Sequence, residues 1–249
     1  MAKFLGSKLF SFFLLIPFTE IFIRLVLGIG NPILFKSHPT IEYEQLPSQN
    51  IRVFHNDIFI NSLGMRSDEL SFPKKENIKR IIIYGDSIIF VGNFLSNERL
   101  ATTTLKRKLN LINNKYEIGN ISSGSWGPGN WLAHIKERGI YNADHVLIVI
   151  NSDDFYDVPN YQSINKNPRL PKKKPLFATI FFAKRYLFPS IKNIFNRFNK
   201  INFLNNDKLL LIKKYNRKNS IERKNSLEDL KEIIKILKIK NTEISVIQF

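Results

Sequence analysis

Apolar residues in this chain gather into short continuous runs that alternate with segments of helical spacing. Four runs are typical of buried strands, because each is continuously apolar and bounded by polar or turn residues. Strands are expected over Arg80–Tyr84, Tyr116–Ile121, His145–Ile150 and Glu243–Phe249. Helices are expected over Glu98–Leu111, Asn130–Arg138, Leu176–Phe188 and Ser226–Ile239. Pro189 is expected to end the third helix, and Ser226 to be the N-cap of the fourth.

This alternation predicts an α/β protein with a doubly wound, mostly parallel sheet. In such sheets the functional groups lie at the carboxyl ends of the strands, near the point where the strand order reverses. Three polar or glycine-rich segments directly follow predicted strands: Gly85–Ser87, Ser122–Gly129 and Asn151–Asp157. The sequence therefore predicts a functional site where these three segments meet.

The first 30 residues form a separate apolar segment. The run Leu9–Gly28 is apolar except for two hydroxyl side chains and the charged residues Glu20 and Arg24, which are four positions apart and can pair on one helix face. As a helix it would be about 30 Å long, the thickness of a bilayer core. A cleaved signal peptide and a buried helix are the alternatives, but no convincing small-residue cleavage site follows the run. We therefore expect residues 1–30 to be an uncleaved transmembrane signal anchor in the cytoplasmic membrane, with the rest of the chain on the extracytoplasmic side.

Between this segment and the first predicted strand the chain is rich in proline and has little periodicity. We expect residues 31–78 to be an irregular N-terminal extension that packs on the main domain, residues 79–249. Within the extension, apolar residues in Ile51–Phe54 and Ile58–Ile60 favour a hairpin whose turn lies between them.

Composition narrows the possible chemistry. The chain has no cysteine, which excludes disulfides, thiolate metal sites and cysteine nucleophiles, and it has four histidines. Its formal charge of +17 would attract polyanions such as nucleic acid, anionic lipid or acidic polysaccharide. No nucleic-acid-binding motif accompanies the charge, so we favour lysines that solvate the surface and expect no nucleic-acid partner.

Ser87 is the candidate nucleophile. A serine on the tight turn that leaves a buried strand can expose its hydroxyl at the sheet edge, near the amides of the helix that follows. The alternative is that Asp86 or Ser87 only caps that helix. The order of a strand, then Gly85-Asp86-Ser87, then a further glycine and a helix favours the nucleophile.

The residues around Ser87 resemble a known nucleophile block. Tyr84–Ile88, with the sequence YGDSI, is similar to the block that carries the nucleophile of the SGNH/GDSL hydrolase superfamily. Gly119–Asn130, with the sequence GNISSGSWGPGN, is similar to the second block, whose glycine amide contributes to the oxyanion hole. The resemblance implies a flavodoxin-like SGNH fold, with Ser87 as the nucleophile and Gly124 in the oxyanion hole.

The N-terminal part of the chain extends this resemblance. Asn61–Ser67, with the sequence NSLGMRS, and the segment around Glu20 and Arg24 are similar to membrane-bound bacterial members linked to surface polysaccharides. The resemblance spans Phe18 to Phe249. It implies an acylated or acidic cell-surface polysaccharide as the partner, besides the membrane itself, and it implies no cofactor or metal.

The chain departs from the family pattern at two points. The family's third block offers an asparagine amide just before an aspartate, whereas Asp153 and Asp154 stand at that place here. A carboxylate repels the developing negative charge of an oxyanion, so Asn151 is the alternative donor.

The second departure concerns the catalytic base, which comes from a C-terminal D-x-x-H block in the family. No D-x-x-H occurs in this sequence, and no histidine follows His145. His134 is expected on a helix surface, and His145 begins a strand at the end remote from the site. We expect an SGNH domain truncated before its histidine block, with a genuine pseudoenzyme as the alternative.

Together these observations predict a serine esterase or O-acyltransferase relative that acts on ester groups of cell-surface glycans. Without a base the serine stays a neutral alcohol, so we expect it to be inactive in the form given. The alternative is a non-catalytic protein that binds acidic polysaccharide or serves in its assembly.

Overall fold

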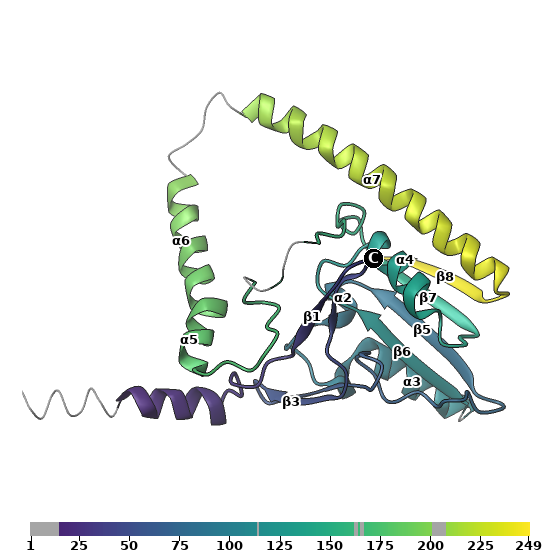
Figure 1. Cartoon of the computed structure of the whole chain (residues 1–249), viewed down its shortest axis with the longest axis horizontal. Helices are drawn as coiled ribbons and strands as arrows, with labels where there is room; N and C mark the ends of the chain where they lie inside the picture. Colours follow the sequence, from purple (N-terminus) through teal and green to yellow (C-terminus); the bar gives the residue numbers. More distant parts are fainter. Residues whose placement is uncertain (1–14, 114, 162–163, 165–166, 201–207) are drawn as a thin grey trace, which may run out of the picture.

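The structure, a computed structural model, describes residues 15–113, 115–161, 164, 167–200 and 208–249. Its centre is a parallel sheet of four strands in the order β6-β5-β7-β8 (Figure 1). The strands are β5 (Lys79–Gly85), β6 (Tyr116–Ser122), β7 (His145–Ile150) and β8 (Glu243–Gln248). The helices are α2 (Ser87–Phe90), α3 (Ala101–Ile112), α4 (Pro128–Arg138), α5 (Ala178–Phe182), α6 (Phe188–Lys200) and α7 (Lys208–Ile239). The described residues also form a helix at residues 15–25, the 3₁₀ turn η1 (Asn97–Arg99) and the π-helical turn η3 (Ala183–Leu187).

The sheet separates two apolar cores, because β5 is covered on both faces. Ile82 and Tyr84 of β5 point into the larger core, together with Trp131 of α4 and Ile233 of α7. Ile83 belongs to the smaller core on the other face, against which side chains of α3 pack. Side chains alternate between the faces of a strand, so a continuously apolar strand is stable only when both faces are buried.

The strand order places a switch point beside β5. The chain passes from β5 outward to β6 and then returns to the other side of β5 to form β7 and β8. The loops that leave β5 and β7 therefore diverge at the same edge of the sheet. A crevice forms at such a point in open parallel sheets, and it is where ligands bind in this class of fold.

Residues 31–78 contain two antiparallel strand pairs. The first joins β1 (Phe35–His38) to β2 (Glu42–Gln45), and the second joins β3 (Gln49–Val53) to β4 (Asn56–Ile60). The second pair is the hairpin that the sequence predicts, so this prediction is confirmed. Its turn residues Phe54 and His55 both have positive φ, as a two-residue turn between twisted strands requires.

The expected transmembrane helix is not supported. None of the helices formed by the described residues is both long enough and apolar enough to cross a bilayer. The described residues of the predicted anchor form a helix at residues 15–25. Residues 1–14, the start of the predicted anchor, lie outside the described residues. The expected α/β fold with a parallel sheet is present, but the expected N-terminal membrane span was wrong.

The two charged residues of this helix bind α5. Glu20 accepts hydrogen bonds from the backbone amides of Ala178 and Thr179, at 2.8 and 2.9 Å, and from the Thr179 hydroxyl. Arg24 pairs with Glu20 at 2.7 Å and donates to the carbonyl oxygen of Pro175. Burial opposes ionisation of Glu20, but the hydrogen bonds from Thr179, Ala178 and Arg24 outweigh it and lower its pKa to about 2. The predicted pairing of Glu20 with Arg24 is thus confirmed, and the pair fixes the start of α5.

Two predicted helix boundaries are wrong. Ser226 is not an N-cap but is buried inside α7, which already begins at Lys208, because residues 208–225 are rich in leucine, lysine and other good helix formers. Pro189 does not end the third predicted helix. The wider π-helical turn η3 immediately precedes it, and the helix continues as α6.

Candidate functional site

Ser87 stands at the carboxyl end of the central strand, as the first residue of α2. The Asp86 side chain caps α2 by accepting a hydrogen bond from the Ile88 amide at 2.8 Å. Asp86 is therefore the helix cap, which leaves the exposed Ser87 hydroxyl for other contacts. That hydroxyl lies 3.4 Å from Oδ2 of Asp86, a long and weak hydrogen bond.

Ser87 opens onto a cavity of about 820 Å³. One wall is the segment that follows Ser87, from Phe90 to Phe94, and another is the turn Ser123–Ser125. Tyr156 and Asp157, from the loop after β7, contribute a third wall. The carboxyl ends of β5, β6 and β7 thus meet at one cavity, whose volume is typical of sites for small ligands.

Gly124 lies in the turn that follows β6 and lines the same cavity as Ser87. The Tyr43 hydroxyl of β2 donates a hydrogen bond to the Gly124 carbonyl and holds this turn against the N-terminal strands. Three residues further on, a side chain at Gly127 would approach the carbonyl oxygens of Asp157 and Asp154 to 2.4 and 2.5 Å. Glycine at 127 therefore allows the loop after β6 to pack directly on the loop after β7.

The predicted site residues of the loop after β7, Asn151, Asp153 and Asp154, do not line the cavity onto which Ser87 opens. The Asn151 side-chain amide donates to Oδ2 of Asp86 at 2.9 Å and to Oδ1 of Asp154 at 3.1 Å. Both amide hydrogens therefore bond to carboxylates, and neither is directed to an oxyanion. Asp153 is exposed, and its backbone amide donates to Oδ1 of Asn151.

Several carboxyl groups lie close together in and around this loop, and burial and mutual repulsion raise the pKa values of two of them. Asp154 is 1% exposed, and burial together with the neighbouring Asp86 carboxylate raises its pKa to about 7, against the lowering effect of the hydrogen bond from the Asn151 backbone amide. Burial and the Asp86 charge also raise the pKa of Asp157. Among the described residues no group of histidine and acidic side chains is arranged to hold a metal ion.

All four histidines lie in the described part of the chain, and none lines the Ser87 cavity. His134 is not on a helix surface as the sequence predicted. It is buried in the larger core, with Nδ1 3.3 Å from the Tyr84 hydroxyl, and burial lowers its pKa to about 4. His145 pairs with Ile81, at the end of the sheet opposite Ser87, as expected.

The residue that sequence reasoning missed is Arg66, in the segment Asn61–Ser67. It is 1% exposed. Its guanidinium group donates to three backbone carbonyl oxygens within residues 90–95, which comprise the cavity wall 90–94 and the residue after it. The acceptors are Phe90, Gly92 at 2.6 Å and Leu95 at 2.5 Å. Burial lowers the pKa of Arg66 to about 10, so the group stays charged at neutral pH.

Arg66 holds a strained segment. Val91 has a φ of 57°, in the left-handed region that β-branched residues rarely adopt. Such a conformation costs on the order of 1–3 kcal/mol and persists only where the surrounding contacts determine it. The bonds from Arg66 to Phe90 and Gly92 flank Val91 on both sides. No pattern in the sequence around Arg66 predicts its contacts with residues 90–95. The only indication was that Arg66 belongs to the segment NSLGMRS, which resembles the family.

No protein-family model matches the chain, and no curated protein is significantly similar to it. The functional interpretation therefore depends on the residues and geometry described above.

We predict that Arg66→Met lowers the free energy of unfolding by about 3 kcal/mol, because the substitution leaves one buried and two partly buried carbonyl oxygens without this donor. Chemical denaturation measures the change. Amide hydrogen exchange is expected to rise over residues 90–95. The exposed Arg52→Met is the control and is expected to change stability by less than about 0.5 kcal/mol. Equal effects of the two substitutions would show that the guanidinium contacts do not hold this wall.

We also predict that stability falls as pH rises from about 4 to 7. The folded protein holds the Asp154 proton more tightly than the unfolded chain does, so the protein loses stability as pH rises from the ordinary aspartate pKa through the folded value of about 7. Asp154→Asn, which resembles the protonated form, is expected to flatten this part of the profile in thermal denaturation. The exposed Asp153→Asn is the control, and a profile equally steep in the wild type and in Asp154→Asn would contradict the assignment.

Proposed function

We propose that this protein is an SGNH/GDSL-type serine esterase or O-acyltransferase relative that binds ester groups of cell-surface glycans at the Ser87 cavity with little or no turnover. The observation that carries the proposal is the exposed Ser87 hydroxyl at the end of a buried parallel strand, opening onto a cavity of about 820 Å³ that the Gly124 turn also lines. This is the arrangement in which a serine nucleophile and backbone amide donors can reach one carbonyl group.

The surroundings of Ser87 favour slow turnover. Nucleophilic attack needs a base that accepts the serine proton, and no histidine reaches the cavity. The nearest acceptor is the Asp86 carboxylate, 3.4 Å away, and it is already bonded to the Ile88 amide and the Asn151 side chain. An oxyanion formed here would also lie near Asp157, whose ionisation is itself disfavoured by burial and by Asp86.

A second candidate is a non-catalytic protein that binds acidic polysaccharide. Arg169 and Arg185 line the same cavity as Ser87. The Arg185 guanidinium is oriented by hydrogen bonds to the carbonyl oxygens of Pro168 and Arg169, at 3.0 and 2.9 Å. Oriented guanidinium groups recognise carboxylates well, so a glycan with acidic sugars suits this wall without any chemistry at Ser87.

Hydrolysis of p-nitrophenyl acetate tests the first proposal. We expect a rate enhancement no greater than about 10³–10⁴ over water, the level that remains when a catalytic triad is incomplete. Ser87→Ala is expected to leave that low rate unchanged. A rate near the ordinary enzymatic value of about 10 s⁻¹ that Ser87→Ala abolishes would show that Ser87 is activated without a histidine.

Binding of an O-acetylated acidic polysaccharide, compared with the same polymer after mild alkaline de-acetylation, separates the two candidates. If the cavity binds acyl groups, calorimetry should show roughly fivefold tighter binding of the acetylated form, because each ester methyl group buries apolar area. Ser87→Trp, which obstructs the cavity, should remove that difference, whereas the exposed Leu111→Trp on α3 should not. Equal affinity for both polymers, with strong salt dependence, would favour the non-catalytic binder.

A further inference from the structure

The exposed apolar side chains of this protein are concentrated on two helical segments. On the helix at residues 15–25, Leu15, Phe18, Phe22 and Leu25 are 45–79% exposed. On the segment from α5 to α6, Leu176, Phe177, Phe188 and Phe195 are 53–81% exposed. Large apolar residues scattered singly over a surface are ordinary, but a contiguous group of this kind marks a binding surface.

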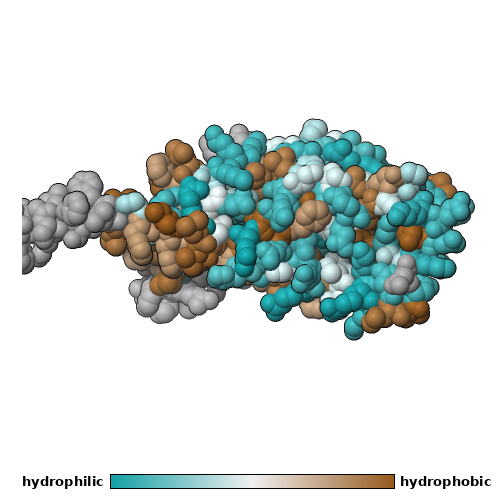
Figure 2. Space-filling view, turned by 90° about the horizontal axis from the view of Figure 1, so that it is seen from below, coloured by the Kyte–Doolittle hydropathy of each residue, from teal (hydrophilic) through white to brown (hydrophobic). Residues whose placement is uncertain are grey.

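The two segments form one surface because the polar contacts of Glu20 and Arg24 join them. Glu20 binds the first amides of α5, and Arg24 binds the carbonyl oxygens of Pro175 and Leu176. Figure 1 shows the helix at residues 15–25 beside the α5 end of the segment, away from the central sheet. Figure 2 shows apolar residues gathered at this end of the molecule. We call this end the apolar–basic surface; it consists of residues 15–26 and 172–195.

Each helix has one continuous apolar face, and Ile16, on the side of Glu20, is exposed as well. At 100° per residue, Leu15, Phe18, Phe22 and Leu25 lie on one face of their helix, and Glu20 and Arg24 lie on the opposite face. The polar contacts therefore attach the helix to the protein and leave its apolar face free. On α6, Phe188, Ile191, Ile194 and Phe195 likewise share one face.

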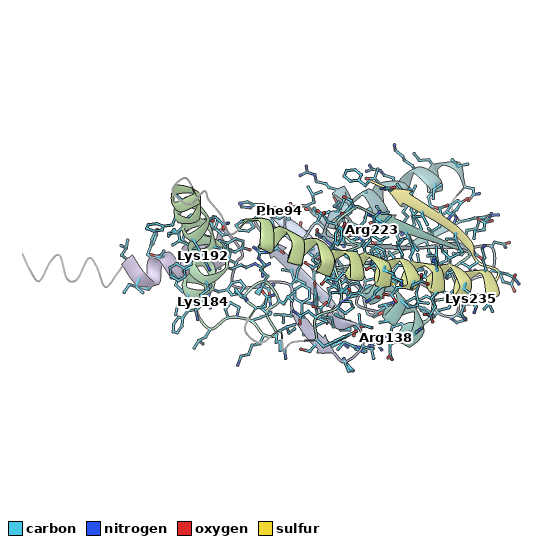
Figure 3. All side chains as sticks on the ribbon, turned by 90° about the horizontal axis from the view of Figure 1, so that it is seen from above. Phe94, Arg138, Lys184, Lys192, Arg223 and Lys235 are labelled. Carbon is cyan, nitrogen blue, oxygen red and sulfur yellow. The ribbon has the colours of Figure 1, made fainter. Side chains whose placement is uncertain are left out.

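Apart from Glu20, which pairs with Arg24, the charged residues around these apolar faces are positive. From Val158 to Asn206 the sequence contains no aspartate or glutamate and ten lysines and arginines. Lys172, Lys173 and Lys174 are exposed immediately before α5. Lys184 and Lys192 are exposed on the helical segment itself, where Figure 3 shows them. A surface that combines exposed phenylalanine and leucine with unopposed lysine matches an anionic bilayer, which offers apolar chains below negatively charged headgroups.

We propose that the apolar–basic surface docks on the surface of an anionic lipid bilayer, with the apolar faces of residues 15–25 and α6 in the headgroup region and Lys184 and Lys192 among the lipid phosphates. The helices lie in the plane of the interface and do not cross the membrane. The charged residues outside their apolar faces suit this position, because an interfacial helix needs only one apolar side. The inference is independent of any activity at Ser87.

Vesicle co-sedimentation of the full chain tests the proposal. We expect binding to vesicles of equal parts phosphatidylglycerol and phosphatidylcholine, and much weaker binding to phosphatidylcholine alone. The double variant Ile191→Ser/Phe195→Ser is expected to lower the partition coefficient at least tenfold, because both side chains leave the apolar region. Lys192→Gln is expected to lower it about fivefold, as one lysine near an anionic surface contributes about 1 kcal/mol.

Matched substitutions elsewhere serve as controls. Leu111→Ser/Ile112→Ser removes two apolar side chains at the end of α3, both more exposed than Ile191 and Phe195, and Lys235→Gln removes an exposed lysine from α7 (Figure 3). Both control proteins are expected to bind as the wild type does. Circular dichroism checks that every variant keeps its helical content.

A site-specific probe locates the contact. Because the chain has no cysteine, Ile194→Cys and Leu111→Cys each accept a single environment-sensitive dye. Anionic vesicles should shift the emission of the dye at 194 to the blue and leave the dye at 111 unchanged. Equal binding to both kinds of vesicle, no loss in the double variant, or no shift at 194 would overturn the proposal. Concentration-dependent self-association that Ile191→Ser/Phe195→Ser abolishes would instead assign the surface to a second copy of this chain.

Discussion

The burial of β5 on both faces is the constraint on which the rest of the structure depends. This strand pairs with β6 on one edge and β7 on the other, and apolar residues cover both of its faces. A strand in this position has no free edge or face, so chemistry can be presented only where it ends. Gly85, Asp86 and Ser87 occupy that end, and the helix cap formed by Asp86 directs the chain so that Ser87 becomes exposed.

The carboxyl groups near Ser87 give the site a character that a nucleophilic serine alone would not have. Asp86 bonds to Asn151, and Asn151 in turn bonds to Asp154, so the loops after β5 and β7 are connected by acidic groups and one amide. Because Asp154 is buried beside Asp86, its pKa is raised to about 7 and its carboxyl group retains a proton near neutral pH. The same arrangement that joins the loops therefore opposes additional negative charge at the serine, which is the charge that acyl transfer requires.

The sequence predicted the strands, the hairpin after Gln49 and the edge of the sheet at which polar loops meet, because these follow from local periodicity and from the rules of parallel sheets. Predictions from the sequence failed where contacts between distant parts of the chain determine burial or the extent of a helix. The helical sequence around His134 gives no sign of burial, yet the rings of Tyr84, Trp126 and Tyr141 pack around it. Ser226 has the properties of an N-cap, but α7 is stable beyond it. Glu20 and Arg24 can pair within an apolar run, and no pattern in the run indicates that they bind α5 instead of crossing a membrane.

The segment from α5 to α6 connects the cavity to the apolar–basic surface. In η3, Arg185 lines the cavity and Tyr186 lies 3.4 Å from the Asn93 side chain of the cavity wall. The adjacent Lys184 and Leu187 are exposed on the other side. The ring of Tyr186 also packs on Phe54, at the tip of the β3–β4 hairpin. The segment from α5 to α6 therefore contacts both the cavity wall and the tip of that hairpin. The apolar–basic surface and the space in front of Ser87 are thus built in part from the same helical segment.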